Sequence, residues 1–254
     1  MKVKTIIDFM EMVAPCEVAL DFDNVGLLVG RCENDVTKIL TALDCSLDVV
    51  KEAAKIGAQM IVCHHPIMFS PVQKITDETP QGRMLLAAIE EKISIFAAHT
   101  NLDFAQGGLN DYFLKRIGFE PKGDIEEGEG RIFDVGTISA KELCEKIKTA
   151  LGLKLIRTSM EEERILHTGA LCTGGGKSLA KSAAQKADFY ISGDLGHHDI
   201  LDLYEAGCGF IEVSHFDSEK IAMDLLYERL TEHFGGEIEI VKSQANKNPM
   251  STII

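Results

Sequence analysis

Histidine and a carboxylate recur at the same spacing in two distant parts of this sequence. His99 is followed four positions later by Asp103, and His215 is followed four positions later by Glu219. Each pair follows a predicted strand that is mainly apolar. Imidazole nitrogens and carboxylate oxygens together suit zinc, iron, manganese, nickel or cobalt. The sequence therefore indicates a site for divalent metal ions.

A third cluster is the adjacent pair His64 and His65, which directly precedes Pro66 and follows Cys63. In a regular strand, neighbouring side chains point to opposite faces, but a chain that turns into a proline at the strand end can bring both rings together. Two adjacent histidines therefore fit two metals that share one pocket. The alternative is that each histidine is an isolated polar residue, hydrogen bonded at the protein surface.

The apolar pattern predicts the elements that carry these residues. Strands alternating with amphipathic helices are typical of a parallel α/β sheet, in which ligands bind beyond the carboxyl ends of the strands. The histidine pair and the His99 segment follow two successive predicted strands. We predict strands at 39–43, 60–63 and 93–98, and helices at 3–13, 47–56, 81–91, 108–117 and 140–151.

The two halves of the chain share a pattern. The run from Thr41 to His64 is matched by the run from Gly169 to Asp194, and the apolar strand before His99 is matched by the one before His215. Such self-similarity indicates an internal repeat. We expect two similar α/β domains related by this repeat, with a dinuclear metal site between them.

A stretch rich in glycine and glutamate at 123–130 indicates the domain junction. We therefore expect a first domain at 1–124 and a second at 125–254. The second domain would contain the segment with His215 and Glu219, and its C-terminal helix would pack back on the first domain.

Composition limits the class of protein. With 254 residues, 45% of them hydrophobic, the chain can bury a sizeable core. A net charge of −14 argues against nucleic-acid binding. We expect no membrane span, and seven scattered cysteines fit reduced thiols in a cytoplasmic protein.

A run of three glycines before Lys177 and Ser178 is similar to a phosphate-binding loop only at first sight. The spacing GxxxxGK[ST] is absent, because the residue five positions before Gly176 is Leu171. A glycine turn before a helix explains the run, with anion contact as the weaker alternative.

Several motifs spread over almost the whole chain identify a resemblance. They are Asp23-Asn24-Val25-Gly26-Leu27, His64-His65-Pro66-Ile67-Met68-Phe69, His99-Thr100-Asn101-Leu102-Asp103, Gly107-Gly108-Leu109-Asn110-Asp111, Gly193-Asp194 with His198, Ser214-His215 with Ser218-Glu219, and Asn248-Pro249. Together they resemble the Nif-three-like dinuclear metal-centre family, whose members are called GTP cyclohydrolase I type 2 homologs. Phe22 and Ser214 stand where the family often has tryptophan and glycine.

The resemblance implies a specific ligand set for two divalent metal ions. In such a centre His64 and Asp103 bind one ion, His65 and His215 bind the other, and Glu219 reaches both. The resemblance also implies a ring-shaped homohexamer whose metal sites face an inner cavity.

Two metals in one pocket can bridge and activate a water molecule, which is hydrolase chemistry. The substrate would be a small phosphate-bearing molecule, with GTP suggested by the family name, and His99 or His198 would transfer protons. The resemblance places His99 and Asp194 near the ligands. The alternative is a non-catalytic hexamer that stores or delivers metal or serves as a scaffold for protein or nucleic-acid partners.

Overall fold

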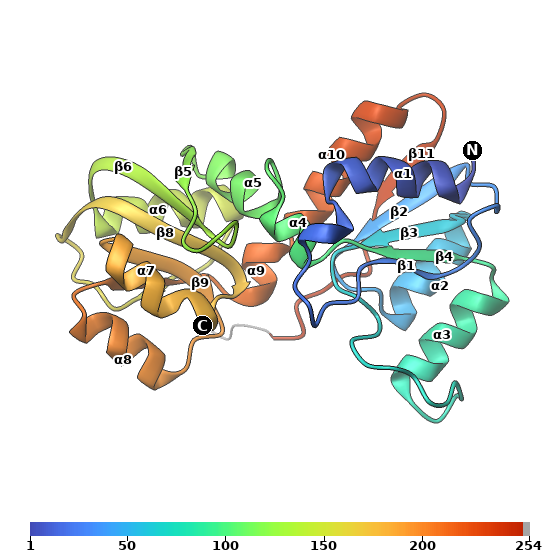
Figure 1. Cartoon of the computed structure of the whole chain (residues 1–254), viewed down its shortest axis with the longest axis horizontal. Helices are drawn as coiled ribbons and strands as arrows, with labels where there is room; N and C mark the ends of the chain where they lie inside the picture. Colours follow the sequence, from blue (N-terminus) through green and yellow to red (C-terminus); the bar gives the residue numbers. More distant parts are fainter. Residues whose placement is uncertain (251–254) are drawn as a thin grey trace. The chain divides into compact units, whose positions relative to one another are not determined.

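The computed structural model describes residues 1–250 and combines α-helices with two β-sheets (Figure 1). The described residues form two compact units: Met1–Ala105 with the stretch from Ala222 onward, and Gln106–Ile221. This mixed architecture confirms the predicted α/β class. The expected domains at 1–124 and 125–254 stay a prediction, because compactness does not measure which segments fold independently.

The first unit is built on a five-stranded sheet in the order β1-β4-β3-β2-β11. Strand β1 is antiparallel to β4, and the remaining neighbours are parallel. The strands are β1 (Gly26–Val29), β2 (Lys38–Ala42), β3 (Met60–Cys63), β4 (Ser94–Ala97) and β11 (Glu239–Lys242). The three strands predicted before residue 100 are confirmed to within one residue at each end.

Helices cover both faces of this sheet, with α1 and α10 on one side and α2 and α3 on the other (Figure 1). Ser46 caps α2 by accepting a hydrogen bond from the Val49 amide, and Gly57 ends it in the left-handed conformation. Alternate residues of β2, β3 and β4 pack against α2 and α3 on one face, and α1 and α10 cover the other (Figure 1), so these strands are buried on both faces. The helices are α1 (Val3–Val13), α2 (Leu47–Ile56), α3 (Pro80–Glu90), α4 (Thr100–Phe104), α10 (Ala222–Phe234) and the 3₁₀ turn η1 (Cys16–Val18).

The second unit contains a six-stranded mixed sheet in the order β5-β6-β8-β9-β10-β7. Its central strands β8, β9 and β10 are parallel. The strands are β5 (Pro121–Gly123), β6 (Arg131–Ser139), β7 (Arg157–Thr158), β8 (Ile165–Gly175), β9 (Phe189–Gly193) and β10 (Gly209–Glu212). The helices are α5 (Leu109–Arg116), α6 (Ala140–Leu151), α7 (Ala180–Lys186), α8 (His197–Glu205), α9 (His215–Glu219) and the 3₁₀ turn η2 (Lys177–Leu179).

The same succession of elements occurs in both units. In the first, β2, α2, β3, α3 and β4 lead into the short helix α4, and in the second, β8, α7, β9, α8 and β10 lead into the short helix α9. Each short helix carries one of the recurrent carboxylates, Asp103 or Glu219.

Among the described helices, none has the length and apolar character that a membrane span requires.

Candidate metal centre

Three histidines of the first unit gather beyond the carboxyl ends of β3 and β4. His64 and His65 directly follow β3, and His99 lies two residues after the end of β4. The centroid of the His64 ring is 5.0 Å from that of His65 and 5.2 Å from that of His99, and 5.6 Å separates the other two. Each ring offers a nitrogen within 4.8 Å of the nitrogens of the other two. One cation could therefore contact atoms of all three.

The Nδ1 atom of each of the three imidazoles contacts an oxygen of the protein, which orients the ring. A backbone carbonyl can only accept a hydrogen bond, so the contact of His64 with Ala98 requires a proton on its Nδ1. In the neutral ring, Nε2 then carries the lone pair that binds metals, as in the carboxylate–histidine–metal arrangements of known sites. The partners of Nδ1 are Ala98 O for His64 at 2.8 Å, Asp44 Oδ1 for His65 at 2.7 Å, and Asp23 Oδ2 for His99 at 2.9 Å.

Asp23 is the buried carboxylate that fixes His99. Its Oδ2 accepts hydrogen bonds from the Thr100 amide at 3.1 Å and the Thr100 hydroxyl at 2.5 Å, as well as from His99. Burial raises the pKa of Asp23, but the hydrogen bonds from His99 and Thr100 outweigh it and hold the pKa well below its usual range. Asp23 is therefore ionised and keeps the Nδ1–H tautomer of His99.

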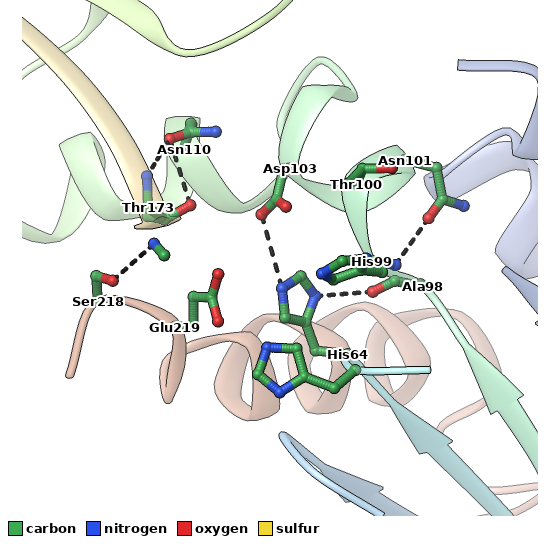
Figure 2. Close-up of polar contacts among 12 residues, drawn as sticks. His64, Ala98, His99, Thr100, Asn101, Asp103, Asn110, Thr173, Ser218 and Glu219 are labelled. Atoms are coloured by element: carbon green, nitrogen blue, oxygen red, sulfur yellow. Dashed lines mark hydrogen bonds and ion pairs between the residues drawn. The ribbon is translucent and has the colours of Figure 1, made fainter. Parts of the chain in front are cut away.

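Asp103 brings a carboxylate to the buried ring of His64 (Figure 2). Its Oδ1 lies 3.8 Å from His64 Nε2, which is beyond hydrogen-bond length. His99 is the N-cap of α4 and Asp103 lies within its first turn, so the four-residue spacing places both on one side of the helix. An imidazole nitrogen and a carboxylate oxygen at this separation are suited to sharing a cation between them.

The second unit holds His215 and Glu219 on α9. The Ser214 side chain caps this helix by accepting from the Asp217 amide, and the four-residue spacing puts His215 Nε2 2.9 Å from Glu219 Oε2. On the other side of the ring, His215 Nδ1 lies 2.8 Å from Asp194 Oδ2. The hydrogen bond to Glu219, more than the one to Asp194, raises the pKa of His215 to about 9.

Glycine at position 174 makes room for the carboxylate of Glu219. A Cβ at Gly174 would lie 2.0 Å from Glu219 Oε1 and 3.4 Å from His215 Nε2. Gly174 also has φ +66°, and its amide donates to Ser218 Oγ at 2.9 Å. The glycine run that is similar to a phosphate loop therefore serves to seat a buried acid, since Glu219 is only 3% exposed.

Comparison with known proteins matches nearly all of this chain to one family. The family model described as Duf34/NIF3 (NGG1p interacting factor 3) matches residues 1–249. The chain belongs to the Duf34/NIF3 family. This confirms the resemblance seen in the sequence motifs.

Members with full-length similarity to this Duf34/NIF3 chain include a Clostridium perfringens protein named GTP cyclohydrolase 1 type 2 homolog. It is 35% identical, and the alignment covers 100% of both chains. The solved structure called reduced HcgD from Methanocaldococcus jannaschii is 32% identical, with a TM-score of 0.85 over 96% of this chain and 98% of that one. A Bacillus cereus protein related to NIF3 shares the fold, with a TM-score of 0.91 at 21% identity over 100% of this chain and 99% of that one.

The remaining histidine expected at the site of this Duf34/NIF3 protein is His198. His198 is exposed in the first turn of α8, where its ring centroid is 5.3 Å from that of His197. Among residues 1–250, His198 is not part of any group of three metal-binding side chains, whereas His99 is. Cys63 is buried beneath the histidine pair and donates from Sγ to His65 O at 3.3 Å.

Two residues that support the site were not predicted from the sequence of this Duf34/NIF3 chain. Asp44 holds His65, and it could have been found, because it lies just beyond the carboxyl end of β2, the neighbour of β3. Gly174 had no such signal, since its role depends on contact with a residue 45 positions away. The proposed ligands themselves all stand beyond strand ends, where their sequence pattern placed them.

We expect Asp44→Ala to weaken divalent-metal binding about 10- to 100-fold, because His65 loses the carboxylate that orients it. Titration calorimetry with Mn²⁺ on the full chain measures the change. Asp202→Ala, which removes an exposed carboxylate from α8, is the matched control and should bind the metal as the unaltered chain does. Equal affinity in both variants would show that Asp44 does not support a metal ligand.

Proposed function

We propose that this protein is a hydrolase that depends on two divalent metal ions and acts on a nucleotide or another phosphate-bearing small molecule. The observation that carries the proposal is the set of His64, His65 and His99, whose Nδ1 atoms are all engaged and whose nitrogens converge within 4.8 Å. A cluster of three oriented imidazoles beside a carboxylate is chemistry typical of a metal centre. The names of curated relatives suggest a nucleotide ligand.

The proposed ligands are those that the family resemblance assigns. We infer that His64 and Asp103 bind one ion, that His65 and His215 bind the other, and that Glu219 reaches both. The donor set fits such ions, because imidazole and carboxylate suit zinc, iron, manganese, nickel or cobalt. The room that Gly174 leaves for the Glu219 carboxylate supports the same assignment. We attribute the recurrence of ligands beyond strand ends to an internal repeat.

Bound metal ions would supply an activated water and would stabilise negative charge that develops on the substrate. The protein's own contribution to proton transfer is assigned to His99. Asp23 retains the proton on His99 Nδ1, so Nε2 is the atom that accepts or donates a proton. His198 is the second candidate for this role, with its exposed ring at the start of α8.

The proposed hydrolase activity can be tested with metal-loaded protein. The chain is loaded with Mn²⁺, Zn²⁺ or Fe²⁺ and incubated with GTP and with a panel of phosphoesters, and the products are followed by chromatography. We expect turnover of at least one substrate with metal and none after chelation. If metal binds but no substrate turns over, the protein is instead the non-catalytic metal-binding scaffold that the sequence left as the alternative.

Assembly into a homohexamer remains a prediction from the family resemblance. Light scattering coupled to size-exclusion chromatography measures the mass in solution, and we expect six copies of the 27.9 kDa chain. A monomer or dimer at micromolar concentration would contradict the predicted ring.

A further inference from the structure

Two phenylalanine rings are exposed in the loops that adjoin His99. Phe22 is 64% exposed and Phe69 is 54% exposed. The sequence has twelve phenylalanines, and within residues 1–250 only these two are exposed. Burial of an aromatic ring is strongly favourable, so rings that stay exposed in two loops joined by the Asn24–Met68 hydrogen bond indicate a surface for a ligand.

The loop that carries Phe69 is anchored at the two residues that precede this ring. The Asn24 side chain donates from Nδ2 to Met68 O at 2.6 Å, and the Gln81 side chain donates from Nε2 to Ile67 O at 2.7 Å. The side chains of Ile67 and Met68 pack against the core of the first unit. Phe69 is therefore held at a defined place beside the histidine cluster while its ring stays exposed.

The Phe69 ring contacts His99, and the loop that carries Phe22 binds the same histidine through Asp23. The centroid of the Phe69 ring is 5.6 Å from that of His99, with the two planes at 73°. Phe22 directly precedes Asp23, whose carboxylate binds His99 Nδ1 at 2.9 Å. The edge-on contact of Phe69 with His99 leaves a face of the phenylalanine ring available for a planar group.

We propose that Phe69 and Phe22 form a stacking surface for the base of a nucleotide, which makes nucleotides, rather than phosphoesters without a base, the substrate class of the site. This inference rests on the proposed function for the role of the neighbouring histidines. Aromatic side chains bind bases through their π-faces with little preference for sequence, whereas a sugar phosphate offers no ring to stack. The two apolar rings carry no charge and so add nothing to the binding of a bare phosphate.

Binding measurements with two matched probes test this surface. Titration calorimetry of the full chain compares GMP with ribose 5-phosphate, with and without Mn²⁺. We expect Phe69→Leu and Phe22→Leu to bind GMP roughly 5- to 150-fold more weakly, while ribose 5-phosphate binding stays unchanged. Phe69→Tyr should restore GMP binding, because tyrosine keeps the aromatic face. Tyr204→Leu, which removes an exposed ring from α8, is the control and should leave both affinities unchanged.

The outcomes separate this inference from the metal proposal. The stacking surface is refuted if Phe69→Leu binds GMP as tightly as the unaltered chain, if it loses affinity for both probes equally, or if the unaltered chain binds GMP no tighter than ribose 5-phosphate. Elemental analysis of the same samples reports the metal independently. A chain that binds no metal but shows Phe69-dependent GMP binding keeps the stacking surface and loses the proposed hydrolase function.

Discussion

Replacing His64 by alanine is expected to weaken divalent-metal binding by more than about 100-fold, beyond the loss typical of a residue that only orients a ligand. His64 is fully buried, its Nδ1 is fixed by Ala98 O, and its Nε2 lies 3.8 Å from Asp103 Oδ1. The ring is therefore held in one orientation with a carboxylate beside its lone pair. Alanine removes this nitrogen from the cluster.

Metal binding should also raise the thermal stability of the protein. A ligand present at 100 times its dissociation constant stabilises the folded state by about 2.7 kcal/mol, which for a chain of this size corresponds to a rise in Tm of about 5 to 10 °C. We expect Mn²⁺ to raise the Tm of the unaltered chain more than the Tm of His64→Ala, which keeps the ligands proposed for the other ion. Differential scanning calorimetry measures both, and elemental analysis gives the bound metal.

A matched histidine separates loss of the ligand from loss of a hydrogen bond. His167 on β8 contacts a backbone carbonyl, Gly136 O, through Nδ1 at 2.8 Å, as His64 contacts Ala98 O. His167→Ala should therefore keep the metal-dependent rise in Tm. The ligand assignment is wrong if folded His64→Ala retains the same rise as this control.

Most of the first unit could be predicted from the sequence because its signals are local. Ser46 and Gly57 delimit α2, and continuous apolar runs mark strands that helices bury on both faces. Because β3 and β4 are parallel neighbours, the rule that ligands gather beyond strand carboxyl ends was enough to bring His64 and His99 together.

The parts that could not be predicted depend on contacts between distant residues. The one-turn helix α4 was not predicted, since five residues carry too little periodicity to reveal a helix. From the sequence, Asp23 could be a loop cap or a residue that orients a group of the site. Its contact with His99, 76 positions away, shows that it orients this histidine. Sequence spacing thus located the donors, but packing determines how they are oriented.

Replacing Gly174 by alanine is expected to displace Glu219 and to destabilise the fold by about 2 to 5 kcal/mol. The new Cβ would lie 2.0 Å from Glu219 Oε1 and 2.9 Å from its Cδ, and Glu219 is buried, so the carboxylate cannot move into open solvent without repacking. Steric overpacking contributes about 1–3 kcal/mol, and the left-handed backbone adds about 1–2 kcal/mol for a residue with a Cβ.

Gly152 provides a control that isolates the steric part of this effect. It has the same φ, +66°, at the end of α6, but a Cβ there would meet nothing within 4 Å. Gly152→Ala should therefore cost only the backbone term, about 1–2 kcal/mol, and keep the metal. Urea denaturation and elemental analysis compare the two variants. Since Glu219 is proposed to reach both ions, Gly174→Ala should lose bound metal as well as stability. If Gly174→Ala matches Gly152→Ala in both measurements, Gly174 is not needed to make room for the Glu219 carboxylate.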